Sequence, residues 1–303
     1  MKNKELIMLI GLPGSGKTTW AKNYKEENKN VIIVSSDAIR EELGLENTAE
    51  HNKICFDEVE KRTIKGMKNG FKVIVDATNL NYKKRMQFLK RVCPKNEEII
   101  AEAVVIATSY ENCLKRNSER DRVVPKEVIK RMRESFNFPL FNEGFYDIRI
   151  VYNDNTIYRF NEFKDIEQDN PNHTKSVLEH CKMACCIAFD ELCDKEIELA
   201  CLLHDIGKLE TKTFINSKGE KTDTAHYYGH ENVSAYNAMF EENIRKNYFI
   251  DEYETIEILQ LINWHMLFHR ISTEKARNKY TYLLGKDFMN KLRIINLIDN
   301  MSK

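Results

Sequence analysis

The chain has 303 residues, of which 42% are hydrophobic and 31% are charged, and its formal net charge is zero. This is the composition of an ordinary soluble protein, and the length is sufficient for two domains. No run of apolar residues reaches the eighteen that a membrane span needs, and the apolar stretch near the N-terminus is too short for a signal sequence. We therefore expect a cytoplasmic protein that does not associate with membranes.

The charges are unevenly distributed along the chain. Residues 1–160 contain 29 basic and 23 acidic side chains, whereas residues 161–303 contain 18 basic and 24 acidic ones. Two units with different partners are therefore expected. The excess of basic side chains in the first is compatible with a phosphate-rich ligand.

The eight cysteines include no C-x-x-C pair, so neither a zinc ribbon nor a redox pair is indicated. Five of them lie between residues 181 and 201 within a helical pattern. Small buried hydrophobic side chains are the preferred interpretation, and a soft-metal site is the alternative.

The first strand is expected over residues 6–10, and a glycine-rich loop follows it as Gly11-Leu12-Pro13-Gly14-Ser15-Gly16-Lys17-Thr18. In a G-x-x-x-x-G-K-[ST] loop, backbone N–H groups surround a polyphosphate, the lysine reaches the β- and γ-phosphates, and the hydroxyl ligates Mg²⁺. A helix that begins at Lys17 would add the positive end of its dipole. The predicted nucleoside-triphosphate site consists of Gly11, Gly14, Ser15, Gly16, Lys17, Thr18 and Thr19.

A β-branched run over residues 31–34 predicts a buried strand, and Ser35-Ser36-Asp37-Ala38-Ile39-Arg40 follows it. Ligands of parallel sheets bind beyond the carboxyl ends of the strands, so Asp37 is expected near the phosphates. In a helix that begins at Asp37, Arg40 lies one turn later on the same face. The pair could accept a proton from a hydroxyl and hold a phosphate. The alternative is an N-cap aspartate followed by a surface arginine.

The next elements alternate between helices and strands. Helices are expected over residues 49–69 and 82–92, and strands over residues 71–76 and 103–106. This alternation predicts a parallel sheet covered by helices. Asp76 stands at the end of its strand, where a P-loop protein holds Mg²⁺ or a water of its shell. A capping or turn aspartate is the alternative.

Residues 114–133 contain eight basic and three acidic side chains. On a helix, Arg116 and Arg120 would project from one face, and on a lid they could stabilise a phosphoryl group during transfer. A solvated charged surface is the alternative. Further along, residues 147–152 predict a strand, and residues 157–160 fit a second strand or a small hairpin.

Four motifs of the first half resemble, in the same order, the kinase domain of bacteriophage-type polynucleotide 5′-kinases and their bacterial end-healing relatives. They are GLPGSGKTTW, SSDAIR, DATNLNYKKR and KRNSERDRVVPKEVIKRM, and they cover about residues 5–152. The resemblance implies an α/β P-loop kinase domain over residues 1–160, in which Lys17 and Thr18 would hold ATP and Mg²⁺. The family pattern Asp-Thr-Asn is Asp76-Ala77-Thr78-Asn79 in this chain, which has one extra residue between the aspartate and the Thr-Asn pair.

The same resemblance implies roles for single residues and a substrate. Asp37 would be the general base that deprotonates a polynucleotide 5′-hydroxyl, and Arg40 would grip the terminal phosphodiester of the substrate. Arg120 would be the lid arginine on the donor phosphates, with Arg116 beside it. The implied substrates are RNA or DNA ends.

Residues 161–171 are acidic and end in Asn170-Pro171, which predicts a linker. Residues 172–303 are almost entirely helical in pattern and contain seven of the eight histidines. An apolar helix over residues 199–203 leads into His204-Asp205. Further histidines and a carboxylate make this a candidate metal site, and such ligands suit Mn, Fe, Co, Ni or Zn. The set consists of His180, His204, Asp205, His230, His265 and Asp299.

The second half resembles the HD-domain metal-dependent phosphohydrolases from about residue 171 to the end. The motifs that carry the resemblance are His180, His204-Asp205, Gly229-His230-Glu231, His265 and Asp299. An all-α domain is implied, whose minimal metal ligands would be His180, His204, Asp205 and Asp299. His230 and His265 would hold a second ion, Asp205 would bridge both ions, and Lys208 would meet the substrate phosphate.

Three histidines are left outside this ligand set. His173 remains a candidate neighbour of the metal, whereas His226 and His269 are expected to be structural or to support the ligands. Whether the site holds one ion or two is left open by the sequence.

Together, the two resemblances predict a nucleic-acid end-healing enzyme. The first domain would phosphorylate 5′-hydroxyl ends, and the second would clear 2′,3′-cyclic phosphate or 2′- or 3′-phosphate ends so that a nucleic-acid ligase, an expected partner, can seal them. One alternative is a nucleoside or metabolite kinase joined to a nucleotidase. Another is a nucleotide-gated RNA-binding regulatory protein.

Overall fold

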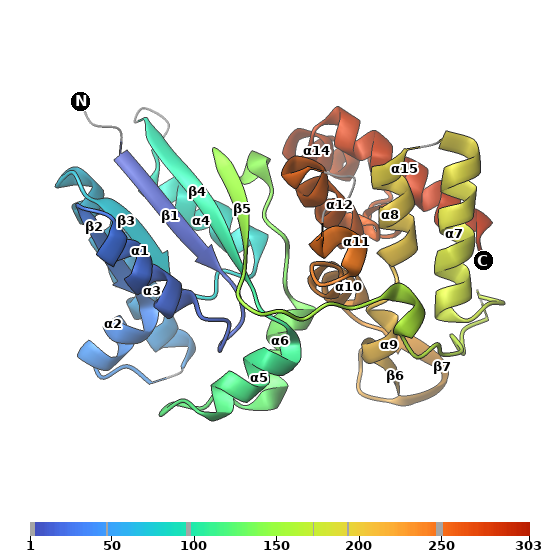
Figure 1. The fold of residues 1–303 in the computed structure, drawn as a ribbon, viewed down its shortest axis with the longest axis horizontal. Coiled ribbons are helices and arrows are strands. Elements are labelled where there is room, and N and C mark those ends of the chain that lie inside the picture. Colours follow the sequence, from blue (N-terminus) through green and yellow to red (C-terminus); the bar gives the residue numbers. More distant parts are fainter. Residues whose placement is uncertain (1–3, 47, 95–97, 172, 193, 247–250) are drawn as a thin grey trace. The chain divides into compact units, whose positions relative to one another are not determined.

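The computed structural model describes residues 4–46, 48–94, 98–171, 173–192, 194–246 and 251–303. The chain forms two compact units, which are shown in Figure 1. The first consists of Met1–Ile129 and Pro139–Asn155, and the second of Lys130–Phe138 and Thr156–Lys303. The first unit contains a sheet, and the second is mainly helical.

The first unit is built on a five-stranded parallel sheet with the order β2-β3-β1-β4-β5. Its central strands are continuous apolar runs because helices bury both faces. This confirms the predicted α/β fold, and it brings the carboxyl ends of β2, β3 and β1 to one edge. The strands are β1 (Lys4–Ile10), β2 (Val31–Ser35), β3 (Lys72–Asp76), β4 (Ile99–Ala107) and β5 (Asp147–Tyr152).

Helices cover the two faces of this sheet. On one face, Trp20 and Tyr24 of α1 pack against a buried cluster that includes Ile7 and Ile74. On the other face, Gly66 of α3 lies so close to the sheet that an added Cβ would be 2.9 Å from Val73 Cγ2. The helices of this unit are α1 (Lys17–Glu27), α2 (Ser36–Glu42), α3 (Ala49–Lys68), α4 (Tyr82–Val92), α5 (Tyr110–Ser118), the start of α6 (Lys126–Glu134) and the 3-10 helix η1 (Phe141–Glu143).

The predicted helices over residues 49–69 and 82–92 are confirmed as α3 and α4. Two local expectations differ from the structure. Ile54, which belongs to the apolar pattern of α3, is 44% exposed. Residues 157–160 form no strand, since Tyr158 makes only an isolated bridge to Glu241 of the second unit.

A buried ion pair fixes the loop that follows β3. Arg85 Nη2 lies 2.6 Å from Glu143 Oε1, and both side chains are fully buried. Arg85 Nη1 also donates to the backbone carbonyls of Asn79 and Leu80. Desolvation raises the pKa of Glu143, although the Arg85 charge counteracts it. The pair therefore connects η1 to the loop after β3, at the edge of the sheet where the carboxyl ends of β2, β3 and β1 lie.

The second unit is mainly helical, as predicted, but it also contains an antiparallel hairpin of β6 (Lys212–Ile215) and β7 (Lys221–Tyr227). Its turn closes with a hydrogen bond from Gly219 N to Asn216 O, at a glycine with a positive φ of 84°. β-branched residues on both sides of this turn favour strands. The helices are η2 (Phe160–Glu162), α7 (Val177–Leu192), α8 (Lys195–Leu203), α9 (Lys208–Thr211), α10 (His230–Ala238), α11 (Glu242–Arg245), α12 (Glu252–Trp264), α13 (Leu267–Arg270), α14 (Glu274–Leu284) and α15 (Lys286–Met301).

Residues 130–138 pack in the helical unit, although they lie inside the range expected for the kinase-like domain. Phe136 and Phe138 are fully buried, and Phe136 makes an edge contact with Tyr236 of α10. Arg133 Nη2 donates to Glu210 Oε2 of α9 at 2.6 Å. The first unit therefore continues in sequence through a segment that belongs to the core of the second.

The cysteines of α7 and α8 are less uniformly buried than expected. Cys181 and Cys201 are buried, but Cys185 is partly exposed and Cys186 is exposed, while Cys193 lies outside the described residues. Desolvation raises the pKa of the Cys185 thiol to about 11. None of the described helices combines the length and the hydropathy that a membrane span requires.

Candidate active sites

The glycine-rich loop connects β1 to α1 and holds two left-handed glycines, Gly14 with a φ of 81° and Gly16 with a φ of 94°. A side chain at Gly14 would collide with the carbonyl oxygen of Cys113, and one at Gly16 with the side chain of Asn153. Both positions therefore require glycine for conformation and for space. The loop has the compact form that a phosphate cradle needs.

Lys17 is buried at the start of α1, and its ammonium lies over this loop. Lys17 Nζ donates to the carbonyls of Gly11 at 3.0 Å and Leu12 at 2.8 Å, and to Ser15 Oγ at 3.3 Å. Burial lowers the pKa of Lys17, and the negative charge of Asp76 opposes that shift. The predicted cation is thus placed within the loop.

Thr18 and Asp76 are brought together from different elements. Thr18 Oγ1 donates to Asp76 Oδ2 at 2.7 Å, and Asp76 is buried at the end of β3. A hydroxyl beside a carboxylate at this edge is the pair with which P-loop enzymes hold Mg²⁺. The arrangement fits such an ion. The loop after Asp76 has one residue more than the family pattern. In this loop Asn79, at a positive φ of 47°, donates from its side chain to Leu9 O at 2.8 Å.

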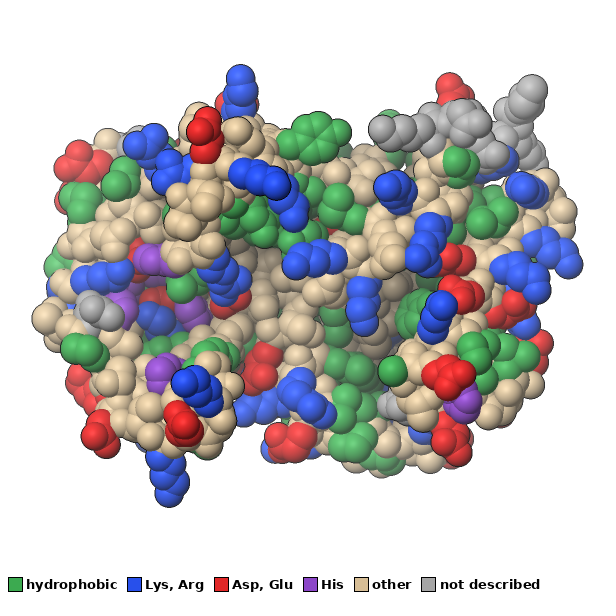
Figure 2. Space-filling view, turned by 180° about the vertical axis from the view of Figure 1, so that it is seen from behind, with side chains coloured by type: hydrophobic (Ala, Val, Ile, Leu, Met, Phe, Trp, Pro, Cys, Tyr) green, Lys and Arg blue, Asp and Glu red, His purple; other side chains and the backbone are tan. Residues whose placement is uncertain are grey.

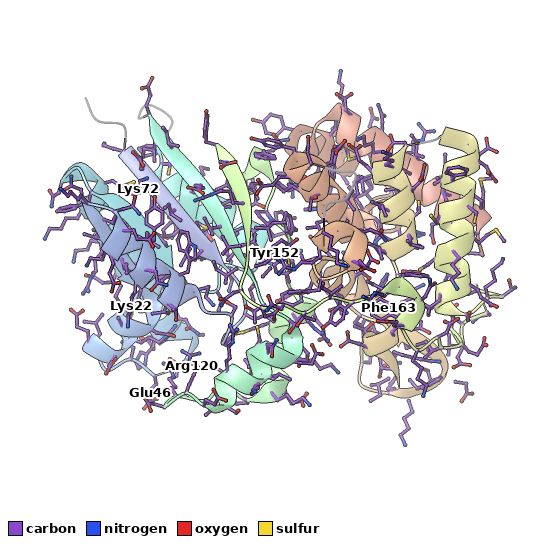
Figure 3. The ribbon with its side chains drawn as sticks, in the orientation of Figure 1. Lys22, Glu46, Lys72, Arg120, Tyr152 and Phe163 are labelled. Carbon is purple, nitrogen blue, oxygen red and sulfur yellow. The ribbon has the colours of Figure 1, made fainter. Side chains whose placement is uncertain are left out.

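Asp37 lies in the first turn of α2, beyond the end of β2. The capping role considered for it belongs to Ser35, whose side chain accepts from Ala38 N. Asp37 Oδ2 instead lies 3.2 Å from Arg120 Nη2, and the two side chains are 66% and 37% exposed. Figure 3 shows Arg120 on the loop after α5, extending toward α2. The structure therefore joins the predicted base to the predicted lid arginine.

Arg40 and Arg116 are both engaged with the protein. Arg40 is buried, with hydrogen bonds to the carbonyl of Glu46 at 3.3 Å and to the side chain of Asn52. Arg116 Nη2 donates to Asn153 O at 2.8 Å. Each guanidinium carries five N–H donors, so these contacts leave donors for a ligand.

The expectation that Arg116 and Arg120 share one helix face is wrong. Helix α5 ends at Ser118, and Arg120 lies in the loop that follows. The side chain of Asn117 donates to Val124 O at 2.8 Å and accepts from Val124 N at 3.1 Å. Because these bonds close the chain into a loop, the helix cannot continue to Arg120.

Figure 2 shows histidine side chains of the helical unit on the face it presents, although the predicted ligands His180, His204, His230 and His265 are buried. The predicted ligands come from the first turn of α7, the end of α8, the start of α10, the end of α12 and the last turns of α15. Two groups have ligand atoms within 4.8 Å of one another. The groups are His180, His204, Asp205 and Asp299, and Asp205, His230 and His265.

Asp205 belongs to both groups. Its Oδ2 lies 3.5 Å from His180 Nε2 and 3.4 Å from His204 Nε2. Its Oδ1 lies 3.2 Å from His230 Nε2 and 3.7 Å from His265 Nε2. One carboxylate thus faces two pairs of imidazoles, which is the geometry of a bridging ligand.

The ring nitrogens are oriented by the backbone. The Nδ1 atoms of His204, His230 and His265 each lie 2.7 Å from a carbonyl oxygen, and a carbonyl can only accept, so Nδ1 carries the proton. Nε2 is then the ring nitrogen that would bind a metal ion, which would displace any proton it carries. His180 and His204 Nε2 lie 3.2 Å apart, close to the ~3 Å between neighbouring ligands with ~2.1 Å bonds to one ion. The donor set therefore fits divalent metals.

The charges of the site act on its titratable groups. Burial lowers the pKa of His204, but the carboxylates of Asp205 and Asp299 outweigh burial and raise it to about 10. Burial raises the pKa of Asp205, but Lys208 and His204 hold it well below its usual range. Burial, followed by the charges of His204 and His230, lowers the pKa of His265. The site favours a carboxylate that is ionised and able to bind a cation.

Lys208 and the remaining histidines lie around this centre. Lys208 Nζ is 2.6 Å from Asp205 Oδ2, so its ammonium lies at the site but is held by the protein. His269 Nε2 is 3.5 Å from Asp299 Oδ2. His173 packs edge-on against the His180 ring, and burial lowers its pKa to about 4. His226 accepts or donates a hydrogen bond with Thr222 Oγ1 and stacks on Tyr228, outside the ligand groups.

Three residues of these sites were missed by the sequence analysis. Asn153 Nδ2 donates to Ser15 O of the glycine-rich loop at 2.7 Å. Ser302 Oγ lies 3.1 Å from His180 Nδ1, and Gln168 Oε1 accepts from Lys208 Nζ at 2.9 Å. Each is an isolated polar residue without a motif, so only its position in the fold reveals it.

Two domain families match the chain. Residues 6–139 match the AAA domain family, and residues 172–303 match the HD domain family. P-loop kinases use ATP with Mg²⁺, and HD domains bind divalent metals, in agreement with the groups of ligand atoms in the structure.

Parts of the chain are similar to several named proteins. L-seryl-tRNA(Sec) kinase of Methanococcus maripaludis is 32% identical over 187 residues, which cover 56% of this chain and 71% of that kinase. A predicted bifunctional polynucleotide kinase/RNA ligase of Autographa californica nuclear polyhedrosis virus is 28% identical over 147 residues, 44% of this chain and 21% of the viral protein. A predicted bifunctional polynucleotide phosphatase/kinase of Acanthamoeba polyphaga mimivirus is 27% identical over 157 residues, 50% of this chain and 34% of that protein.

The chain spans about a third or less of the two viral relatives, but more than two thirds of the archaeal kinase. The expected combination of a P-loop kinase domain and an HD domain is confirmed by these matches. The chain belongs to the P-loop kinase family of the archaeal relative, and behind its kinase domain it carries an HD phosphohydrolase domain.

Proposed function

We propose that the first unit transfers the γ-phosphate of ATP to the 5′-hydroxyl end of RNA or DNA, and that the helical unit removes phosphate from 2′,3′-cyclic phosphate or 2′- or 3′-phosphate ends. The observation that carries the kinase proposal is the exposed Asp37 carboxylate. It lies 3.2 Å from Arg120, and it follows β2, two strands from the glycine-rich loop. An open carboxylate at this edge can reach a large acceptor.

In the kinase step, Asp37 accepts the proton of the acceptor hydroxyl, whose oxygen forms a bond to the γ-phosphorus while the bond to the β-γ bridging oxygen breaks. Lys17 and Arg120 stabilise the negative charge of the transferring group. The Asp37–Arg120 pair is largely exposed, and such pairs contribute little in water. Donor phosphates can therefore draw Arg120 away and free the base.

The remaining kinase residues bind and orient. Thr18 and Asp76 would hold Mg²⁺, and the N–H groups of the glycine-rich loop would surround the phosphates. Arg40, beside α2, would contact the terminal phosphodiester of the acceptor with its remaining donors. Arg116 would contact the donor from the lid.

In the helical unit, His180, His204, Asp205 and Asp299 would hold one divalent ion, and His230 and His265 with Asp205 a second. Imidazole and carboxylate ligands suit Mn, Fe, Co, Ni or Zn. Such ions, when bound, supply Lewis-acid activation of water and of a phosphate oxygen. Asp205 belongs to both ligand groups, and Lys208 would bind the phosphate of the substrate.

The relatives support this assignment of substrates. Two of them are named as bifunctional enzymes that contain a polynucleotide kinase, one with an RNA ligase and one with a phosphatase. A nucleic-acid ligase is therefore the expected partner of this chain. A kinase for 5′ ends joined to a phosphoesterase for 3′ ends would supply both substrates of such a ligase.

Labelled RNA and DNA oligonucleotides with defined 5′ and 3′ ends test the proposal, when they are incubated with ATP and a panel of divalent metals. Transfer to 5′-hydroxyl ends and release of phosphate from 3′ ends are expected. Asp37→Ala should abolish transfer but keep ATP binding, and His204→Ala with Asp205→Ala should abolish phosphate release but keep kinase activity. Transfer to free nucleosides or sugars alone would instead identify a small-molecule kinase.

A second candidate acceptor follows from the archaeal relative, whose name specifies L-seryl-tRNA(Sec). That acceptor also presents a hydroxyl on an RNA end, and the identity of 32% is higher than for the viral relatives. The same assay with seryl-tRNA in place of the oligonucleotide separates the two acceptors. ATP binding without transfer to any acceptor would favour a nucleotide-gated RNA-binding protein.

A further inference from the structure

Residues 165–170, which we call the strap, were expected to be part of a linker and precede the HD match at residues 172–303. Its first end is tied to the start of α7. The carboxylate of Asp165 accepts from Ser176 Oγ at 2.6 Å and from Leu178 N at 2.9 Å. Val177 N donates to Ile166 O at 3.0 Å. These bonds fix the strap against a helix that carries a metal ligand.

The second end of the strap is tied to the hairpin. Ala225 N donates to Asp169 O at 2.9 Å, and the Asp169 carboxylate pairs with Lys212. The hydroxyl of Tyr227 donates to Gln168 O. Asp169 has a positive φ of 44°, a conformation that costs energy unless the surroundings hold it. The strap is therefore held in the helical unit by hydrogen bonds at both of its ends.

The side chain of Gln168 points from the strap into the metal centre. It is 1% exposed. Its Nε2 donates to Lys175 O at 3.2 Å, and because a carbonyl can only accept, this bond fixes the orientation of the amide. Its Oε1 accepts from Lys208 Nζ at 2.9 Å. Gln168 therefore contacts Lys208, the lysine that pairs with Asp205.

Lys208 is held from three sides. Its Nζ lies 2.6 Å from Asp205 Oδ2, 2.9 Å from Gln168 Oε1 and 5.4 Å from the centre of the Tyr227 ring. A divalent ion on Asp205 would compete with Lys208 for the same carboxylate. The contacts of Lys208 with Gln168 and Tyr227 do not involve this carboxylate. These two side chains can therefore keep the ammonium at the site when the ion is bound.

We propose that Gln168 is a positioning residue of the phosphoesterase site. It holds Lys208 Nζ in place so that one of the three N–H donors of the ammonium meets the phosphate group of the substrate. Without Gln168, Lys208 loses an acceptor that does not depend on Asp205. The inference rests on the proposed function of the helical unit.

The test compares the metal-loaded full-length protein with Gln168→Met, which keeps the length of the side chain but removes the acceptor. We expect the KM for a phosphoester to rise about tenfold, with kcat changed much less, since a hydrogen bond to a charged group is lost. The affinity for inorganic phosphate, measured by calorimetry, should fall by the same factor. Metal content and Tm should stay at the wild-type values.

Glu167→Gln, at the exposed neighbouring position of the strap, is the matched control and should leave KM, kcat, phosphate affinity, metal content and Tm unchanged. An unchanged KM and phosphate affinity in Gln168→Met would overturn the proposal, as would a joint loss of metal and activity. Should Gln168→Met not fold, Gln168→Asn keeps the amide but shortens its reach. The same rise in KM is expected, and a wild-type KM would refute the proposal.

A double-mutant cycle with Lys208→Met separates positioning from an independent role. Because Gln168 acts through Lys208, the double variant should bind phosphate no more weakly than Lys208→Met alone. Additive losses would contradict the proposal. Phosphate binding does not depend on ester hydrolysis, so a protein that hydrolyses no ester would disprove the proposed function while the role of Gln168 could still be measured.

Discussion

At the residue scale, Gly14 and Gly70 show how the same backbone conformation carries different constraints. Their φ angles are 81° and 80°, both in the left-handed region. A Cβ at Gly14 would collide with the carbonyl oxygen of Cys113, whereas a Cβ at Gly70 would meet nothing within 4 Å. Gly70 is required only by its backbone, but Gly14 is required by its backbone and by the packing of α5 against the loop.

Gly14→Ala should therefore abolish ATP binding, because the loop must move away from α5 to admit a methyl group. Gly70→Ala, the matched control, should bind ATP like the wild type and lose only about 1 kcal/mol of stability from its backbone. Calorimetric titration with ATP and urea unfolding measure the two effects. Equal ATP affinity in the two variants would contradict the assigned role of the loop.

The histidines of the helical unit lead to a prediction about pH. Without metal, the pKa of His204 is about 10, so its imidazole is protonated throughout the neutral range. A metal ion that binds Nε2 must displace this proton, and its affinity should therefore rise with pH between about 6 and 9. Titration calorimetry in buffers of different ionisation enthalpy should detect proton release at pH 7.5. An affinity independent of pH would show that metal binding displaces no proton from His204 in this range.

At the scale of elements, residues 130–138 lie in sequence between two parts of the first unit but belong to the core of the second. Phe138 N donates to Asn263 Oδ1 of α12 at 3.1 Å, and Asn232 Nδ2 donates to Glu134 O at 2.6 Å. These polar contacts accompany the burial of Phe136 and Phe138. Residues 130–138 are therefore a structural part of the helical unit.

Phe136→Ala should destabilise the helical unit by about 3–5 kcal/mol, because it removes a fully buried ring that contacts Tyr236 and leaves a cavity. Phe189→Ala, at a position that is 59% exposed, is the matched control and should cost less than about 1 kcal/mol. Denaturant unfolding followed by circular dichroism measures both. Similar losses in the two variants would argue against this packing.

At the scale of the whole molecule, the described part of the chain contains two separate sets of ligands for cations. Thr18 and Asp76 offer a hydroxyl and a carboxylate, which suit Mg²⁺, whereas the helical unit offers four imidazoles and two carboxylates. The two activities should therefore respond differently to a change of metal.

Removal of tightly bound metal with a chelator, followed by dialysis into Mg²⁺ alone, should restore phosphoryl transfer but not phosphate release. Addition of Mn²⁺, Co²⁺, Ni²⁺, Fe²⁺ or Zn²⁺ should then restore the second activity. The ions that restore it identify the metals the site accepts. Full phosphate release in Mg²⁺ alone would show that the histidine ligands are not needed.

The kinase fold could be predicted well from the sequence, because its signals are local. A β-branched run predicts a strand, and a Gly-rich spacing predicts a phosphate loop, without knowledge of distant residues. The helix through Arg120 was wrong because Asn117 bonds to Val124 and closes a loop, a contact that helical periodicity does not contain. The hairpin at residues 212–227 was missed because its β-branched pattern is short.

The sequence by itself determined the two families, the glycine-rich loop and the identity of the candidate metal ligands, since these depend on residue types at fixed spacings. Only the tertiary structure decided that Asp205 presents one oxygen to each imidazole pair, that Arg120 meets Asp37, and that the strap brings Gln168 to Lys208. The last two contacts join residues that are 83 and 40 positions apart in the sequence. Chain topology and packing set such distances, and no local pattern records them.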